Sequence, residues 1–352
     1  MGKREAMQRV ICSGYYGKGN GGDEALLASL LQMLPPTVEP VVLSGNPSQT
    51  QTHYQVETCD RMNGIDVLNA LRRADALIWG GGSLIQDVTG AISPFYYGGL
   101  MGLAQRMELT TIAWAQGIGP LKRSVSRWLA KKTFSGCSAV SVRDVGSARL
   151  LSDWNIPFTL APDPVWALES RPVAGLWDLP APRVALTLRP HPQLTPQRLS
   201  LIARALVSFQ KATQTFILLI PFQPIQDLAI AQILHQALPE NSQVLILEDP
   251  RQLKGVFRGV EFLIGMRFHS LIMAATEQCR CFALSYDPKV SRLMEELELP
   301  GWEIDQLPED PNLISKIWID CYANNQPFSQ GKIEFFVDRA KVHKELLYSQ
   351  FH

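Results

Sequence analysis

Short apolar segments that end in glycine or a polar turn and lead into a helical segment recur along this sequence. The first covers residues 8–13, and the pattern starts again at Val184, after a stretch rich in proline, tryptophan and glycine at residues 163–182. Alternating strands and helices are typical of parallel sheets covered by helices. The sequence therefore predicts an α/β fold with two Rossmann-like domains, residues 1–170 and 183–325, that face each other across a cleft.

The expected secondary structure has a strand at the start of each repeat of this pattern. Strands are predicted at residues 8–13, 40–43, 74–79, 111–115, 139–142, 184–188, 216–220, 244–247, 262–264 and 282–285. Residues 88–97 contain glycine, serine, proline and three aromatic residues, and we expect a loop over a ligand site there. A charged amphipathic helix at residues 331–351 is expected to pack back onto the first domain.

The composition limits the class of protein. The 352 residues include 33 basic and 33 acidic side chains, so the formal net charge is zero. Without a basic stripe or polybasic cluster, nucleic acid is not an expected partner. The six cysteines are scattered, and the closest pair, Cys279 and Cys281, fits neither a zinc site nor a redox motif. With no signal-peptide pattern and no apolar run of about 18 residues, we expect a reduced cytoplasmic protein without a metal site.

The stretch at residues 261–270 joins a strand to a helix through a charged turn. Residues 262–264 are apolar, Gly265 ends the run, and a largely apolar helix follows from about His269. Ligands bind at the carboxyl edge of an open parallel sheet, and a helix amino terminus favours an anion. Arg267 offers a planar fork for phosphate or carboxylate, and His269 a group for proton transfer. An anion site is therefore predicted here; a helix-capping Arg267 and a merely structural His269 are the alternative.

Other cations follow neighbouring predicted strands of the second domain. Arg189 and Lys289 each come after a strand, as Arg267 does. The carboxyl ends of parallel strands lie along one edge, so these side chains are expected to converge around His269. Several cations around one histidine suit a small substrate with more than one negative charge.

Arg143 follows the strand at residues 139–142 of the first domain. Its position at the equivalent edge would let it face the same cleft. An ion pair with Asp144 or with Asp163 explains the residue equally well.

The loop after the first strand is rich in glycine. Gly17, Gly19 and Gly22 match the dinucleotide-binding fingerprint, but the next strand ends in Ser44-Gly-Asn46 and lacks the acidic residue that holds a ribose. Nicotinamide binding is therefore not expected. The glycines still allow the backbone to approach a ligand closely, although a tight turn alone is about as good an explanation.

Three consecutive glycines, Gly80 to Gly82, follow the strand at residues 74–79. Their backbone N–H groups can form a nest for an anion or a sugar hydroxyl. Aromatic side chains in residues 88–97 could stack on a sugar ring, although packing against the domain is their more frequent use. The predicted acceptor-binding residues are Asn20, Gly21, Asp23, Gly81, Gly82, Ser83 and Asp87.

Six motifs, spread from the first strand to about residue 290, carry a resemblance to a known family. They are GYYGKGNGGDE at residues 14–24, WGGGSLIQD at 79–87, QGIGP at 116–120, SVRD at 141–144, GMRFH at 265–269 and YDPK at 286–289. As a set they resemble the polysaccharide pyruvyl transferase family, and specifically its CsaB type. The resemblance implies a GT-B-like glycosyltransferase architecture and transfer of pyruvate from phosphoenolpyruvate to a sugar as a ketal.

The resemblance also implies roles for individual residues. Arg267 and His269 would bind the donor and carry the proton chemistry, and Arg143 and Lys289 match the family's other donor-binding cations. Arg189 joins this phosphoenolpyruvate-binding set because it follows a neighbouring strand. No cofactor other than the co-substrate phosphoenolpyruvate is expected.

The implied acceptor is a sugar, free or linked to a lipid, of a cell-wall or cell-surface glycan precursor made on the cytoplasmic side. Peripheral association with the membrane face and oligomerisation are left open. Two rival functions also remain: a GT-B glycosyltransferase that uses a nucleotide sugar, and a non-catalytic glycan-binding relative. Release of a nucleotide would identify the first, and the cations around His269 argue against the second.

Overall fold

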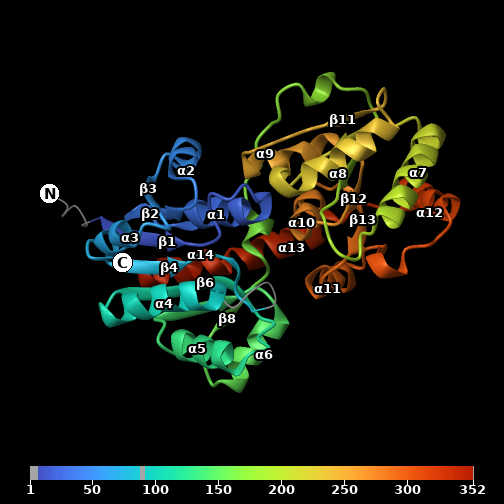
Figure 1. Cartoon of the computed structure of the whole chain (residues 1–352). Helices are drawn as coiled ribbons and strands as arrows, with labels where there is room; N and C mark the ends of the chain where they lie inside the picture. Colours follow the sequence, from blue (N-terminus) through green and yellow to red (C-terminus); the bar gives the residue numbers. More distant parts are fainter. Residues whose placement is uncertain (1–6, 88–91, 352) are drawn as a thin grey trace. The chain divides into compact units, whose positions relative to one another are not determined.

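The computed structural model describes residues 7–87 and 92–351 (Figure 1). The chain divides into two compact units by the contacts it makes. Unit 1 holds the residues up to 18, residues 23–168 and those from 335 onward, and unit 2 holds residues 19–22 and 169–334. Each unit is an α/β structure built on a parallel sheet. Within the described ranges, no helix is both long and apolar enough to cross a bilayer.

Unit 1 is organised around a sheet with β1 near its centre. Its strands are β1 (Gln8–Ser13), β2 (Val38–Ser44), β3 (Glu57–Asp60), β4 (Ala76–Trp79), β5 (Gly82–Ile85), β6 (Thr110–Ile118), β7 (Ala139–Val142) and β8 (Thr159–Leu160). They lie in the order β3-β2-β1-β4-β6-β7-β8, and β5 pairs with β6. The chain order reverses between β1 and β4, so the loops after these two strands lie at the position where such sheets bind ligands.

Helices cover both faces of this sheet. They are α1 (Gly21–Met33), α2 (Pro47–Tyr54), α3 (Gly64–Leu71), α4 (Ile92–Arg106), α5 (Ser124–Ser135), α6 (Val145–Asp153), the 3₁₀ helix η1 (Pro164–Ala167) and α14 (Val342–Gln350). Figure 1 shows α14, in red, beside β6 of the same unit. The last helix of the chain thus completes the layer on one face of the first sheet.

β1 illustrates why central strands of unit 1 carry apolar residues at consecutive positions. Val10 and Cys12 pack in one core cluster with Leu347 of α14. Ile11, between them, packs in a second cluster with Phe134 of α5. Successive side chains of a strand point to opposite faces, so a strand covered on both sides needs apolar residues at every position.

Unit 2 is a second parallel sheet with its own helices. Its strands are β9 (Arg183–Thr187), β10 (Phe216–Leu219), β11 (Ser242–Val244), β12 (Phe262–Gly265), β13 (Arg280–Ser285) and β14 (Gly301–Glu303), in the order β11-β10-β9-β12-β13-β14. Its helices are α7 (Pro196–Thr213), α8 (Pro224–Ala237), α9 (Pro250–Gly255), α10 (Phe268–Thr276), α11 (Pro288–Leu297), α12 (Pro311–Asn324) and the 3₁₀ helices η2 (Leu176–Asp178), η3 (Val256–Gly259) and η4 (Ile304–Gln306). Helix α13 (Gln330–Ala340) begins in unit 2 and passes into unit 1 at Phe335. Because β9, β12 and β13 are neighbours, the loops that follow them share one edge.

Four helices of unit 2 begin with the same local chemistry. A Thr or Asp side chain accepts a backbone N–H of the first turn, and proline occupies the start of the helix. These caps are Thr195 of α7, Asp249 of α9, Asp287 of α11 and Asp310 of α12. The cap satisfies an N–H group that has no partner within the helix, and proline there has no N–H to satisfy.

Some local predictions are wrong. Residues 92–97 begin helix α4 and do not form a loop, whereas residues 88–91 lie outside the described range. Pro94 favoured the loop prediction because proline breaks a helix interior, but it lies in the first turn of α4, where proline is tolerated. The strand predicted at residues 244–247 lies instead at Ser242–Val244. This strand, β11, is at the edge of the sheet and pairs with β10. The helix predicted at residues 331–351 is two helices, α13 and α14.

Candidate active site

Three of the predicted cations of unit 2 follow neighbouring strands. Arg189 comes two residues after β9, Arg267 two residues after β12, and Lys289 lies in the first turn of α11 after β13. Since these strands are adjacent and parallel, the residues are brought to the same edge of the sheet. His269 lies at the start of α10 and is half-buried.

Arg267 is held by a buried carboxylate that the sequence did not reveal. Its Nε donates to Oδ2 of Asp227 over 3.1 Å, and its Nη2 pairs with Oδ1 of the same residue. The exposed fractions of the two side chains are 7% and 1%. The backbone N–H of Gln223 also donates to Asp227 Oδ2, over 2.9 Å. Asp227 carries no motif, and only the tertiary contact identifies it.

His269 packs against Gly22, in the first turn of α1. A Cβ atom added to Gly22 would lie 2.2 Å from Nδ1 of His269, so only glycine permits this approach. The N–H of Gly21 donates to the carbonyl of Phe222 over 2.7 Å, and the N–H of Gly22 to Oδ1 of Asn20 over 3.1 Å. Asn20 and Gly21, predicted to bind the acceptor, thus lie in unit 2, next to the glycine that contacts His269.

Arg189 makes a different contact. Its Nη1 donates to the hydroxyl of Tyr286 over 2.9 Å, and its guanidinium lies 4.9 Å from the centre of the same ring. His191 packs against the same tyrosine, and the ring centres of His191 and Tyr286 are 5.0 Å apart. Partial burial, and next the charge of Arg189, lower the pKa of His191. The sequence reading included Tyr286 in a motif but gave His191 no role.

Arg143, in unit 1, forms an ion pair with Asp163, one of the two partners considered from the sequence. Both side chains are buried. Asp163 also accepts the N–H of Val165 over 3.0 Å, and Nη2 of Arg143 lies 3.4 Å from Oγ of Ser83. The other considered partner, Asp144, caps α6 through the N–H of Ser147.

A buried histidine of the last helix, His343, is hydrogen-bonded to the residue that precedes Asp163. His343 is fully buried, and its Nε2 lies 2.9 Å from the carbonyl of Pro162, the residue before Asp163. A carbonyl only accepts, so Nε2 carries the proton and Nδ1 accepts from Ser141 Oγ over 2.9 Å. Burial is the main cause that lowers the pKa of His343 to about 4, so the ring is neutral. Nothing in the sequence near His343 indicates this role.

Glu24, at the start of α1, is a second buried titratable group of unit 1. It accepts the N–H of Gly17 over 2.8 Å and lies 3.4 Å from the hydroxyl of Tyr54. Removal from water is the largest cause that raises the pKa of Glu24 to about 7. Its neighbour Asp23, predicted to bind the acceptor, lies half-buried in the same turn.

The three glycines after β4 have packing reasons of their own. A Cβ on Gly80 would lie 1.6 Å from the hydroxyl of Tyr16, and one on Gly81 2.9 Å from Leu26. Gly82 begins β5 and pairs with Gln116 of β6. These contacts explain the glycines without a ligand, while the predicted acceptor contacts of Gly81, Gly82 and Ser83 stay predictions.

Asp87 has a structural task as well. Its two carboxylate oxygens accept the backbone N–H groups of Lys122 and Arg123, each over 2.8 Å, just before α5. These bonds, with the one from Lys122 as the largest cause, lower the pKa of Asp87. An acceptor contact at Asp87 would have to share a carboxylate that is already used by two donors.

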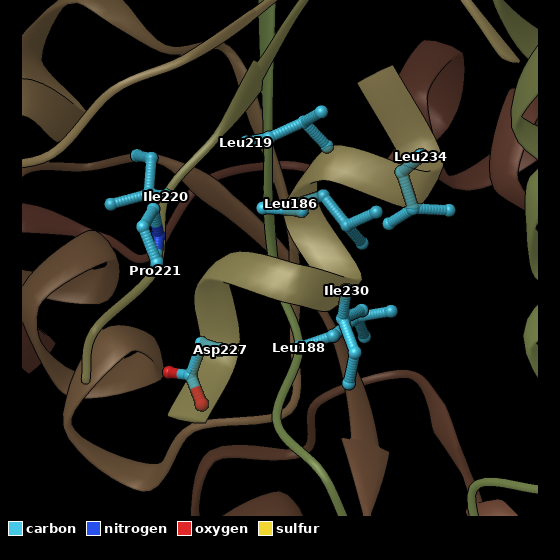
Figure 2. A pocket seen from close by; sticks show the side chains of 9 residues that line it. Leu186, Leu188, Leu219, Ile220, Pro221, Asp227, Ile230 and Leu234 are labelled. Carbon is cyan, nitrogen blue, oxygen red and sulfur yellow. The ribbon is translucent and has the colours of Figure 1, made fainter. Parts of the chain in front are cut away.

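A small hollow beside Asp227 lies within unit 2. Figure 2 shows Asp227 at one end of it and Leu219 and Leu234 at the other. Its volume is about 10 Å³, and apolar side chains form most of its wall. That volume is no larger than one water-sized probe, so the hollow holds no substrate. A wider hollow of about 390 Å³ lies at the opposite, amino edge of the sheet, beside Glu261 and Arg280.

The geometry in unit 2 suits a small anion. Cationic side chains and a histidine lie along one sheet edge, and Arg267 is fixed in place by two hydrogen bonds. Among the residues that the structure covers, no group of three or more His, Cys, Asp or Glu side chains could hold a metal ion. Charge complementarity and proton transfer are the chemistry that these residues can supply.

Several solved structures share this fold at low identity. A UDP-GlcNAc 2-epimerase from Methanocaldococcus jannaschii is 11% identical, with a TM-score of 0.66 over 97% of this chain and 100% of that one. A UDP-GlcNAc 2-epimerase from Neisseria meningitidis, bound to UDP-GlcNAc, is 9% identical, with a TM-score of 0.65 over 97% and 99%. A UDP-glucosyltransferase from Polygonum tinctorium is 11% identical, with a TM-score of 0.57 over 99% and 98%.

These similarities confirm the predicted fold class: the chain has the GT-B architecture, with two α/β domains on parallel sheets. A comparison with curated proteins gives no match. The family model described as polysaccharide pyruvyl transferase matches residues 20–288, which is more than half of the chain and includes Arg143, Arg267 and His269. This protein therefore belongs to the polysaccharide pyruvyl transferase family.

Proposed function

We propose that this protein transfers pyruvate from phosphoenolpyruvate to a sugar as a ketal and releases phosphate. Membership of the pyruvyl transferase family supports a transferase. The observation that carries the choice of donor is the edge of unit 2, where Arg189, Arg267 and Lys289 follow three adjacent parallel strands and His269 begins α10. Phosphoenolpyruvate carries a carboxylate and a phosphate, and such a ligand needs several cations.

The reaction balances with one proton donor and two sugar hydroxyls. A proton adds to the methylene carbon of phosphoenolpyruvate, and positive charge develops at the neighbouring carbon. A sugar hydroxyl forms a bond there and loses its proton, the bond to phosphate breaks, and a second hydroxyl closes the ketal with loss of its own proton. His269 is assigned the proton transfer, which typically contributes about 10²–10⁴-fold. Arg267, Lys289, Arg189 and Arg143 are assigned to the donor's negative charges.

We assign the chain to the CsaB type of the family on its six motifs, with no cofactor beyond phosphoenolpyruvate. The acceptor is then a sugar, free or lipid-linked, of a cell-wall or cell-surface glycan precursor on the cytoplasmic side. The contact between His269 and Gly22 supports a role of the loop at residues 19–22 in arranging the reacting groups. Asp23, Ser83 and Asp87 keep their proposed acceptor role.

A nucleotide-sugar glycosyltransferase is the competing function. The solved structures of similar fold include enzymes whose titles name UDP or a UDP sugar. At identities of 9% and 11%, this likeness shows the fold alone. It gives no reason to place a nucleotide at the cationic edge of unit 2.

The test is incubation with phosphoenolpyruvate and a panel of sugar and lipid-linked acceptors, with phosphate release and product mass as readouts. Titration calorimetry with phosphoenolpyruvate adds the binding constant. Lys289→Ala should weaken donor binding by roughly 1.5–3 kcal/mol, the size of a charge-assisted hydrogen bond. Arg267→Ala should do the same but also leaves Asp227 without its partner, so Lys289→Ala is the cleaner variant. Binding of a UDP sugar in the absence of phosphoenolpyruvate binding would overturn the proposal.

A further inference from the structure

The carboxylate of Asp227 lies where it can set the orientation of Arg267. It accepts three N–H groups: Nε and Nη2 of Arg267 and the backbone N–H of Gln223. The contact with Gln223 fixes the carboxylate to its own helix start, before α8. Two hydrogen bonds to one planar guanidinium then fix the plane of that group as well as its position.

This pairing uses one edge of the guanidinium. Nε and Nη2 form that edge, so Nη1 and the second hydrogen of Nη2 lie outside the pair. An arginine that is held along one edge can present the other edge to a carboxylate or phosphate without first losing side-chain freedom. Such preorganisation lowers the cost of binding an anion.

Asp227 itself is too enclosed to meet a substrate. Its side chain is 1% exposed, and it lines a hollow of about 10 Å³ together with Leu188 and Ile230 (Figure 2). Any effect of Asp227 on a ligand must therefore pass through the groups it holds.

The turn before α8, at residues 221–223, also binds the glycine-rich segment at residues 19–22. Phe222 accepts the N–H of Gly21 through its carbonyl, and Gly22 lies against His269. Residues 221–223 thus connect both halves of the candidate site: through Asp227 to Arg267, and through Gly21 to the loop beside His269.

We propose that Asp227 is a positioning residue for Arg267 in the phosphoenolpyruvate site, an inference that rests on the proposed function. Asp227→Asn keeps the size of the side chain but removes its charge and one acceptor. Asp227→Glu keeps the charge but displaces the carboxylate by one methylene. Both variants should raise the KM for phosphoenolpyruvate roughly tenfold to hundredfold, because the charge-assisted contact to Arg267 is lost or misaligned. The KM for the acceptor should change little.

A double-mutant cycle separates positioning from general damage. Arg267→Lys keeps the positive charge but makes no two-point contact. If Asp227 acts through Arg267, Asp227→Asn should have little further effect on the KM for phosphoenolpyruvate in the Arg267→Lys background. Asp310→Asn, at the cap of α12 in the same unit, is the matched control and should leave that KM unchanged.

The outcomes are distinct. A wild type that neither binds phosphoenolpyruvate nor releases phosphate from it overturns the proposed function and this inference with it. A folded Asp227→Asn with the wild-type KM, in an enzyme that does use phosphoenolpyruvate, overturns the positioning role alone. So does an undiminished effect of Asp227→Asn in the Arg267→Lys background. If the Asp227 variants fail to fold, the test uses Arg267→Lys alone. An unchanged KM for phosphoenolpyruvate in Arg267→Lys would overturn the positioning role, because the two-point contact with Asp227 would then not be needed.

Discussion

Each unit of this protein contains a buried arginine–aspartate pair with a histidine close to it in the structure, but the two histidines differ in exposure. In unit 2, His269 follows Arg267 by two residues and is half-buried. In unit 1, His343 is fully buried and hydrogen-bonded through both ring nitrogens behind the Arg143–Asp163 pair. The same three residue types therefore include a half-buried histidine at a sheet edge in one unit and a fully buried histidine in the other.

The two histidines differ in burial because they lie on helices with different positions relative to the sheet. His269 begins the helix that directly follows its strand, so it lies at the sheet edge, where α/β folds bind ligands. His343 comes from α14, which packs on β6 and β7 of unit 1. Its position satisfies buried polar groups of the sheet and offers no free nitrogen for proton transfer. A histidine near a cationic residue is therefore a catalytic candidate only when a ring nitrogen remains accessible.

The largest expected effect tests this contrast at the two histidines. His269→Ala should lower turnover by about 10²–10⁴-fold and leave phosphoenolpyruvate binding largely intact, because it removes proton transfer and not the main charge. Steady-state kinetics together with calorimetry measure both quantities. Turnover that survives in His269→Ala would remove the assigned role.

The second prediction concerns the buried pair of unit 1. Asp163→Ala leaves Arg143 buried without its carboxylate, and such a loss costs roughly 3–5 kcal/mol of unfolding free energy. Denaturant unfolding measures this change. Asp144→Ala, which removes the carboxylate that caps α6, is the control and should cost about 1 kcal/mol. Equal effects of the two substitutions would mean that the pair contributes no more than a cap.

The third prediction uses pH to examine the buried histidine. The pKa of His343 is lowered from 6.5 to about 4 in the folded state, so the unfolded chain takes up a proton first as the pH falls. Above pH 6.5, His343 is neutral in both states and does not reduce the free energy of unfolding. Between pH 6.5 and about pH 4, its titration lowers that free energy by on the order of 3 kcal/mol. Glu24, whose pKa is raised to about 7, acts in the opposite direction over much of this range.

The measurement is the unfolding free energy at several pH values for the wild type and for His343→Gln. The difference between the two should change between pH 6.5 and 4, with the wild type losing relatively more stability in acid. A Glu24→Gln background removes the opposing titration and serves as the control. A constant difference over this range would show that His343 does not titrate as the structure indicates.

The fourth prediction, with the smallest expected effect, concerns the position of the His269 ring. Gly22→Ala adds one methyl group 2.2 Å from Nδ1 of His269, so the ring must shift. A displacement near 1 Å can cost up to roughly 10²-fold in rate, and we expect a loss of turnover within that limit. Gly102→Ala in α4, where an added Cβ meets nothing within 4 Å, should leave turnover unchanged. An active Gly22→Ala would argue that the ring need not occupy this position.

The positions of the candidate residues in the fold were predictable where those residues follow a strand or belong to a motif. Arg189, Arg267, His269 and Lys289 were identified because each follows a predicted strand, and adjacent parallel strands place such residues at one edge. Asp227 and His343 were not, since neither lies at a strand end nor in a motif. Their roles depend on packing between segments 40 residues apart for Asp227 and Arg267, and 202 residues apart for His343 and Ser141.

By itself, the sequence determined the α/β class, most strand positions and the cationic edge, because hydrophobic periodicity and turn residues act over a few neighbouring positions. Only the tertiary structure decided that Arg143 pairs with the buried Asp163, and that residues 19–22 lie with unit 2. It also decided that one histidine is accessible and the other internal. The physical reason is that burial and hydrogen-bond partners are set by distant segments meeting in space, and a local pattern does not record which segments meet.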